Sequence, residues 1–86
     1  MDEKKILLYP LLTEKSFGIM ERENKLVFVV GKDATKPEIR DAIEKAYNVE
    51  VDNIRIINEF AQGKKAYIKL KPDYDAGKIV GELGLM

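Results

Sequence analysis

The sequence contains neither cysteine nor histidine. Without cysteine it can form no disulfide bond and no thiolate metal site. Without histidine it lacks the usual general base at neutral pH and the commonest metal ligand. We therefore expect the chain to bind no metal ion and no other cofactor.

Long hydrophobic runs are also missing. No apolar stretch approaches the roughly 18–20 residues that a helix needs to cross a bilayer. The first six residues mix acidic and basic side chains, and only a short apolar stretch follows, so they do not resemble a secretory signal. The sequence predicts a soluble, cytoplasmic protein that does not insert into a membrane.

A net charge is absent, because 15 basic and 15 acidic residues cancel. A strongly basic composition, which would point directly to nucleic acid, is therefore excluded. The charges are nevertheless segregated along the chain: residues 41–59 contain five acids and two bases, whereas residues 60–72 contain four lysines and no acid. This pattern is typical of solvated helix and strand faces, and it also permits one basic surface.

Hydrophobic periodicity predicts an alternation of strands and helices within a single domain over residues 1–86. The clearest local signal is Thr35-Lys36-Pro37-Glu38, in which Thr35 can cap a helix and Glu38 can complete a capping box. The predicted strands cover residues 6–9, 25–30, 51 to about 60 and 64–70, and the predicted helices run from Thr13 to Asn24, from Thr35 to Asn48 and from Pro72-Asp73 to Gly84.

Within the second predicted helix, apolar residues recur at helical spacing and form the expected buried stripe: Ile39, Ala42, Ile43, Ala46 and Tyr47. Gln62-Gly63 is the expected hairpin turn between the last two strands. A sheet with helices packed on it buries all of these faces, so the expected fold class is α/β of the α+β type.

The sequence contains no motif for catalysis. A phosphate-binding GxxxxGK[ST], a dinucleotide GxGxxG and a nucleophile GxSxG are all absent. Asp73 and Asp75 could be taken for a metal-binding pair, but their position at a predicted helix start favours a capping role. We therefore predict that the chain is not an enzyme.

A binding surface is better supported. Lys65, Tyr67 and Lys69 alternate along a predicted strand and so share one face, with Lys64 and Lys71 at its ends. Lysines can pair with phosphates while an aromatic ring packs on a sugar or base. The alternative is an ordinary solvent-facing strand whose lysines discourage edge pairing. Additional polar groups that could favour phosphate lie near helix starts: Lys15, Ser16 and Lys36.

In order along the chain, several segments resemble the large-subunit ribosomal protein family numbered twenty-three, and archaeal members in particular. The resemblance covers nearly the whole chain, and the short turn at Gln62-Gly63 is similar to the archaeal and eukaryotic form. The segments are residues 10–16 (PLLTEKS), 24–30 (NKLVFVV), 32–39 (KDATKPEI), 47–51 (YNVEV), 64–70 (KKAYIKL), 73–76 (DYDA) and 83–85 (LGL).

This resemblance implies a four-stranded antiparallel sheet with strand order 1-2-4-3 and flanking helices. It implies a structural component of the large ribosomal subunit that binds large-subunit rRNA near the exit of the peptide tunnel, beside neighbouring ribosomal proteins. It further implies an outer surface for factors that meet the nascent chain: signal recognition particle, nascent-chain chaperones and the membrane translocon.

The resemblance also implies roles for individual residues. Glu14 matches an acidic position that helps dock a ribosome-bound chaperone in bacterial relatives. The residues that it implies for contact with rRNA are Thr13, Lys15, Ser16, Thr35, Lys36, Lys64, Lys65, Tyr67 and Lys69. Arg55 departs from the family pattern, and we add it as a candidate phosphate contact because of its charge.

Some positions depart from the family pattern. Tyr9 stands where archaeal relatives usually have arginine, and the stretch Ile54-Arg55-Ile56 replaces a typical Val-Asn-Thr. Glu59 is acidic at a position where a basic or neutral residue would suit RNA binding better. These departures leave an alternative open: a diverged or redesigned domain of the same fold with weakened RNA binding. Such a domain would act through protein–protein contacts, including a homodimer formed through an exposed apolar strand.

Overall fold

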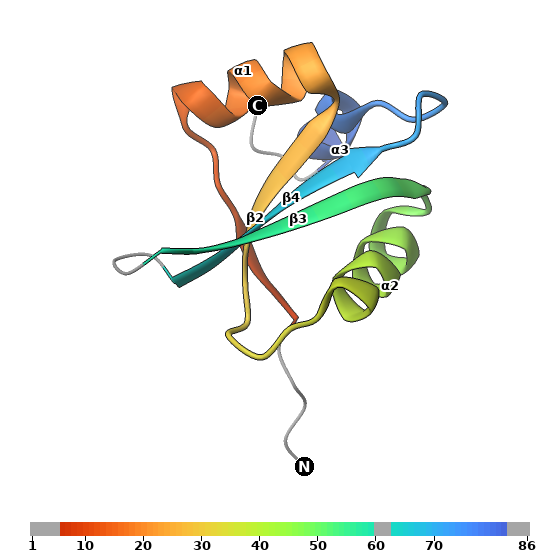
Figure 1. Ribbon diagram of the computed structural model, residues 1–86. Helices are drawn as coiled ribbons and strands as arrows, with labels where there is room; N and C mark the ends of the chain where they lie inside the picture. The colour runs from red at the N-terminus through yellow and green to blue at the C-terminus, as the bar shows by residue number, and fades with distance from the viewer. Residues whose placement is uncertain (1–5, 60–62, 83–86) are drawn as a thin grey trace.

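The computed structural model describes residues 6–59 and 63–82, in which strands and helices alternate before a final hairpin and helix (Figure 1). In chain order the elements are β1 (Leu7–Pro10), α1 (Glu14–Glu23), β2 (Lys25–Val30), α2 (Lys36–Tyr47), β3 (Val51–Glu59), β4 (Gly63–Leu70) and α3 (Ala76–Glu82).

The strands form one four-stranded sheet in the order β1-β2-β4-β3, and every neighbouring pair is antiparallel. The predicted α+β fold and its strand order are therefore confirmed. β2 and β4 lie in the centre, while β1 and β3 form the two edges. β1 carries a register irregularity between Leu7 and Tyr9, and β3 carries one between Val51 and Asn53.

The helix boundaries follow from side-chain caps. The Thr35 hydroxyl accepts a hydrogen bond from the backbone N–H of Glu38 (3.4 Å), and the Glu38 carboxylate accepts one from the N–H of Thr35 (3.0 Å), so the predicted capping box is confirmed. Helices α1 and α2 end at Asn24 and Asn48, both in the left-handed conformation with φ of 56°. Asparagine tolerates this conformation better than most residues, which explains why both helices stop there.

The last helix begins later than the sequence predicts. Residues 71–74 form a turn, closed by a hydrogen bond from the Tyr74 N–H to the Lys71 carbonyl (2.9 Å), and α3 starts only at Ala76. The predicted start at Pro72-Asp73 is therefore wrong. The Asp75 carboxylate accepts a hydrogen bond from the N–H of Gly77 (2.9 Å), which is the capping role expected for this aspartate. Residue 60, near which the third predicted strand ends, Gln62 of the predicted turn and Gly84 at the predicted end of the last helix lie outside the described residues.

The main core lies between one face of the sheet and the three helices. Ile39 and Ile43 of α2 and Ile68 of β4 are completely buried in it. Ala46 is exposed, so its predicted place in the buried stripe is wrong: at this last turn of α2 it is Tyr47 that packs against the core. The remaining core contributions come from Met20 of α1, from Ala34 before α2, from Ala76, Ile79 and Val80 of α3, and from the strand residues Leu26, Phe28, Val30, Val51, Ile54, Ala66 and Leu70.

Asn24 joins two elements that are distant in the sequence. Its side-chain N–H donates to the carbonyl of Tyr74 (2.8 Å), and its side-chain oxygen accepts from the N–H of Ala76 (2.8 Å). The end of α1 is thereby fastened to the start of α3. This contact also explains the late start of α3, because it holds the turn before the helix in a non-helical conformation.

We expect Asn24→Gly to lower the free energy of unfolding by about 1–3 kcal/mol, because glycine keeps the left-handed backbone but leaves buried polar groups without partners. Urea denaturation followed by circular dichroism measures this decrease. Asn48→Gly is the matched control, since Asn48 has the same φ of 56° at the end of α2. Equal decreases in the two variants would contradict the bridging role of Asn24.

Candidate nucleic-acid interface

The face of the sheet that points away from the main core carries a mixture of basic, aromatic and aliphatic side chains. We call it the open face. Cross-strand partners in an antiparallel pair lie on the same face, and residues alternate between faces along each strand. By this register the open face consists of Tyr9 on β1, Lys25, Val27 and Val29 on β2, Lys65, Tyr67 and Lys69 on β4, and Asn53, Arg55 and Ile57 on β3.

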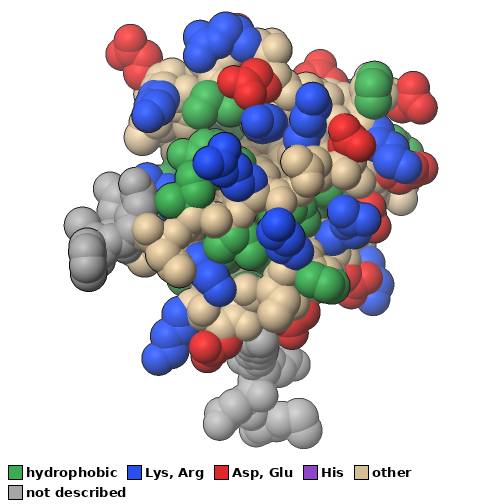
Figure 2. Space-filling model, viewed as in Figure 1, with side chains coloured by type: hydrophobic (Ala, Val, Ile, Leu, Met, Phe, Trp, Pro, Cys, Tyr) green, Lys and Arg blue, Asp and Glu red, His purple; other side chains and the backbone are tan. Residues whose placement is uncertain are grey.

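The register confirms that Lys65, Tyr67 and Lys69 share one face, each directly opposite a residue of β2. Lys65 lies opposite Val29, and Tyr67 lies opposite Val27. Figure 2 shows Lys and Arg side chains interspersed with hydrophobic ones across the middle of one side of the molecule, with most acidic side chains toward its edges. The candidate surface is therefore amphipathic as well as basic.

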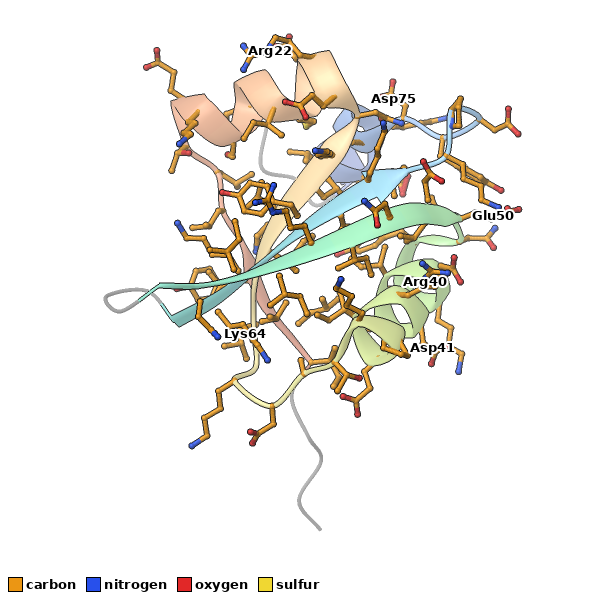
Figure 3. The ribbon with its side chains drawn as sticks, in the orientation of Figure 1. Arg22, Arg40, Asp41, Glu50, Lys64 and Asp75 are labelled. Atoms are coloured by element: carbon orange, nitrogen blue, oxygen red, sulfur yellow. The ribbon has the colours of Figure 1, made fainter. Side chains whose placement is uncertain are left out.

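Lys64 and Lys71 are expected at the ends of this surface, but both make contacts with other parts of the protein. Lys64 lies on the opposite face of β4, where its ammonium group donates to the carbonyls of Lys32 (2.9 Å) and Ala34 (3.0 Å) in the connection between β2 and α2 (Figure 3). Lys71 forms an ion pair with Glu50 (3.1 Å). The structure thus brings together the three central residues of the predicted strand surface but not its two end residues.

The start of α1 borders the open face and forms a groove with it. The groove has a volume of about 180 Å³. Five residues expected to contact rRNA line it: Thr13, Lys15, Ser16, Lys65 and Tyr67. Residues that are about fifty positions apart in the chain therefore meet at one site.

Within this groove Ser16 has a structural task. Its hydroxyl donates to the carbonyls of Leu11 (2.8 Å) and Thr13 (2.9 Å) and accepts from the N–H of Thr13 (2.8 Å). The Thr13 hydroxyl in turn accepts from the N–H of Ser16 (3.1 Å). The Ser16 side chain is buried, so it shapes the wall of the groove, while Thr13 and Lys15 remain exposed at its rim.

Thr35 and Lys36 belong to a second location. They begin α2 immediately after Ala34, whose carbonyl accepts the hydrogen bond from Lys64. The Thr35 hydroxyl donates to the Glu38 carboxylate (3.0 Å), so the polar groups of this helix start are already joined to an acid. The ten residues expected to contact rRNA therefore fall into two groups rather than one continuous surface.

The departures at positions 54–56 lie on two different faces. Ile54 is 3% exposed in the core, and Ile56 is half-buried against the core. Arg55 is exposed on the open face, directly opposite Tyr67. Ile54 therefore provides no surface for a partner and Ile56 only part of its side chain, while Arg55 adds a positive charge beside the aromatic ring. Glu59 is the other departure in this strand, and its side chain lies outside the described part of the structure.

Sequence reasoning did not assign Lys25, Val27 and Tyr9 to this surface. Tyr9 is 52% exposed and lies opposite Val29, so its ring belongs to the open face. Val27 lies in the groove, and Lys25 lies opposite Lys69 and forms an ion pair with Glu23 (2.9 Å). The alternation of β2 was the available signal, because residues 25, 27 and 29 must share a face if residues 26, 28 and 30 face the core.

Acidic side chains gather at another end of the molecule, where α2 leads into β3 (Figure 3). The Glu50 carboxylate binds the Lys71 ammonium group (3.1 Å) and accepts a hydrogen bond from the Tyr74 hydroxyl (3.4 Å). Its hydrogen bond and charge raise the pKa of Lys71, and its charge raises the pKa of Tyr74. The Glu44 carboxylate accepts from the N–H of Val51 (2.9 Å) nearby.

Within residues 6–59 and 63–82, no three acidic side chains are grouped in a way that could hold a metal ion. Of the helices in the same part of the chain, none combines the length and the apolar content that spanning a bilayer requires.

A family model described as "Ribosomal protein L23" matches residues 5–62. The chain belongs to the ribosomal protein L23 family. It is 40% identical over 85 residues to "Large ribosomal subunit protein uL23" of the archaeon Methanococcus aeolicus, a match that covers 99% of both chains. The resemblance seen in the sequence is thereby confirmed.

Eukaryotic relatives in the same family are longer. The chain is 41% identical to "Large ribosomal subunit protein uL23" of Tetrahymena thermophila and 40% identical to "Large ribosomal subunit protein uL23A" of Caenorhabditis elegans. All of this chain is matched in both cases, but it spans only 57% and 58% of those relatives. Members of the L23 family are structural components of the ribosome, so the prediction that the chain is not an enzyme is confirmed.

The contacts of Glu50 predict a decline in stability at alkaline pH. The pKa values of Lys71 and Tyr74 are raised in the folded state above their ordinary values of 10.5 and 10.0. The contribution of these two groups to the free energy of unfolding is therefore fully present below about pH 10, and it disappears as the pH rises through the folded-state pKa values. Glu50→Gln should flatten this decline in the free energy of unfolding, measured by urea denaturation from pH 8 to pH 11.5.

Glu21→Gln removes an exposed carboxylate of α1 that has no hydrogen bond or ion pair to the described residues, and it should keep the alkaline decline of the unsubstituted protein. A decline of the same slope in Glu50→Gln would show that this carboxylate does not set the two pKa values.

Proposed function

We propose that the chain binds large-subunit rRNA as a structural component of the large ribosomal subunit in the cytoplasm, near the exit of the peptide tunnel. The observation that supports this most directly is the groove in which the start of α1 meets β4. The groove combines residues from two distant segments, Lys15 on one side and Lys65 and Tyr67 on the other. Two lysines beside an aromatic ring favour a ligand that carries both phosphates and aromatic bases.

Local charge makes this binding possible despite the neutral net charge. Positive side chains on the open face include Arg55 and Lys69, whereas Glu44 and Glu50 lie where α2 meets β3 and bind groups of the protein itself. Phosphate contacts release counterions from RNA, and this effect depends on the charges that face the nucleic acid rather than on the sum over the protein. A neutral chain with a basic face therefore suffices.

The start of α2 is a second contact region in this proposal. Thr35 and Lys36 lie at the beginning of a twelve-residue helix, where the backbone dipole favours phosphate. Lys64 supports this region from the inside, because its bonds to the carbonyls of Lys32 and Ala34 hold the preceding connection in place.

A protein-docking surface completes the proposal. Glu14 is exposed in the first turn of α1, beside the groove. We assign it to contact with a nascent-chain factor, such as a chaperone, signal recognition particle or the translocon, while neighbouring ribosomal proteins contact other parts of the surface.

Fractionation of native lysate on a sucrose gradient tests the ribosomal assignment. We expect the protein to sediment with large subunits at low salt, and to leave them as salt weakens its phosphate contacts. A protein that stays at the top of the gradient at low salt would refute the assignment.

Substitution of the open-face lysines tests the interface itself. For a fragment of large-subunit rRNA, Lys65→Gln/Lys69→Gln should weaken binding and lower the slope of log K against log salt by roughly 0.7–0.9 for each phosphate that the variant no longer neutralises. Fluorescence anisotropy at several salt concentrations measures both quantities. Lys45→Gln removes a lysine of α2 that pairs with Asp41 (3.1 Å) on the surface, and it should leave both quantities unchanged.

One observation favours a second candidate, a protein–protein contact through β1. Leu8 and Tyr9 are 44% and 52% exposed on this edge strand. An exposed apolar edge can pair with a second chain, including another copy of the protein. Static light scattering distinguishes the two: a dimer that dissociates in Leu8→Lys/Tyr9→Lys favours this candidate, and a monomer that binds RNA tightly and salt-sensitively excludes it.

A further inference from the structure

The groove between α1 and β4 has an apolar floor that phosphate binding by itself does not require. Val27, only 6% exposed, lies at its base, and half-buried Leu11 and Ile19 line it from the end of β1 and from α1. The Leu11 N–H donates to the Val27 carbonyl (2.8 Å), so the main chain here is fixed in position. A ligand that only neutralises lysines would leave this floor in contact with water.

The aromatic wall of the groove is Tyr67. Its half-buried ring lies directly opposite Val27 on one side and Arg55 on the other. The Tyr67 hydroxyl makes no hydrogen bond to the residues that the structure describes. The half-buried ring thus lines the groove together with a polar group, the combination with which aromatic residues bind nucleobases.

Polar and cationic side chains complete the lining of the groove. Lys15 and Thr13 are exposed at the start of α1, and Lys65 lines the groove from β4. An apolar floor, an aromatic wall and a cationic rim match one nucleotide whose base points inward while its flanking phosphates stay outside.

A paired base cannot occupy such a site, because its faces are covered by neighbouring base pairs and its edge is bonded to its partner. In a regular RNA helix phosphates, ribose groups and the edges of paired bases would reach the rim, but no base face would reach the floor. A space of about 180 Å³ also suits one base rather than a run of stacked bases. The ligand class is therefore a nucleotide in a bulge or loop.

We propose that this groove binds the base of one unpaired nucleotide, with the ring of Tyr67 packed on the base and Lys15 and Lys65 at its phosphates. The inference rests on the proposed binding of RNA, and it adds that the site selects unpaired structure rather than duplex.

Three short RNAs of the same sequence test this inference: a continuous duplex, the duplex with one unpaired adenosine, and the duplex with an abasic unpaired position. The abasic RNA keeps the phosphates and the interrupted duplex of the adenosine bulge but lacks the base. We expect the full chain to bind the adenosine bulge more tightly than either other RNA, by roughly 5- to 150-fold in fluorescence anisotropy, the range for stacking of one base.

Substitutions of Tyr67 test whether the preference for the adenosine bulge over the abasic bulge arises in the groove. Tyr67→Leu should remove the difference between the adenosine and abasic bulges while the salt dependence stays the same, and Tyr67→Phe should preserve it because the ring remains. Tyr47→Leu removes a half-buried aromatic ring of α2 outside the groove, and it should leave the difference unchanged. Circular dichroism and urea denaturation establish that each variant is folded.

The outcomes separate this inference from the function on which it rests. Salt-sensitive binding of equal strength to all three RNAs would overturn the nucleotide site and leave RNA binding intact. So would a preference for the adenosine bulge that persists in folded Tyr67→Leu. Absence of binding to every RNA at low salt would overturn both proposals together.

Discussion

Residues 25–30 of β2 pair with residues 64–69 of β4 one for one, without a register shift. Both faces of this central ladder are in use. On one face Leu26, Phe28 and Ile68 meet the three helices and form the core. On the other face Val27, Tyr67 and Lys65 form part of the groove. A slip of one residue would exchange these two sets, placing lysines in the core and isoleucine on the surface, so the stability of the fold and the composition of the interface depend on the same register.

This register also explains how a chain with no net charge can present a basic surface. Lys65 lies opposite Val29 and Ile57, Arg55 lies opposite Tyr67, and Lys69 lies opposite Lys25 and Asn53. Acids such as Glu50 and Glu44 instead hold the junction of α2 and β3, where they bind Lys71, Tyr74 and the backbone of Val51. These acids therefore stabilise the fold at one end of the molecule, while Lys65, Lys69 and Arg55 belong to the open face. Membership of the L23 family, with relatives named for the large ribosomal subunit, agrees with a surface of this kind.

Much of the fold was predictable from local chemistry. The capping box of Thr35 and Glu38, the ends of α1 and α2 at Asn24 and Asn48, and the strand over residues 25–30 each depend on neighbours a few positions away, and all three predictions were confirmed. The start of α3 was predicted wrongly because it depends on Asn24, about fifty residues earlier, which holds Tyr74 and Ala76 in place. The exposure of Ala46 was also missed, since helical spacing places it close to the buried stripe but does not define where that stripe ends.

The sequence by itself determined the class of fold, the absence of thiol and imidazole chemistry, and the common face of Lys65, Tyr67 and Lys69, because composition and the two-residue period of a strand are local properties. Only the tertiary structure decided which of the remaining polar residues join that face. It brought Thr13 and Lys15 to it, turned Lys64 toward the carbonyls of the β2–α2 connection, and buried Ser16 in a helix cap. It also placed Ile54 and Ile56 toward the core and Arg55 toward the open face. The physical reason is that a groove requires contact between elements distant in the chain, and the burial of the core determines which elements meet.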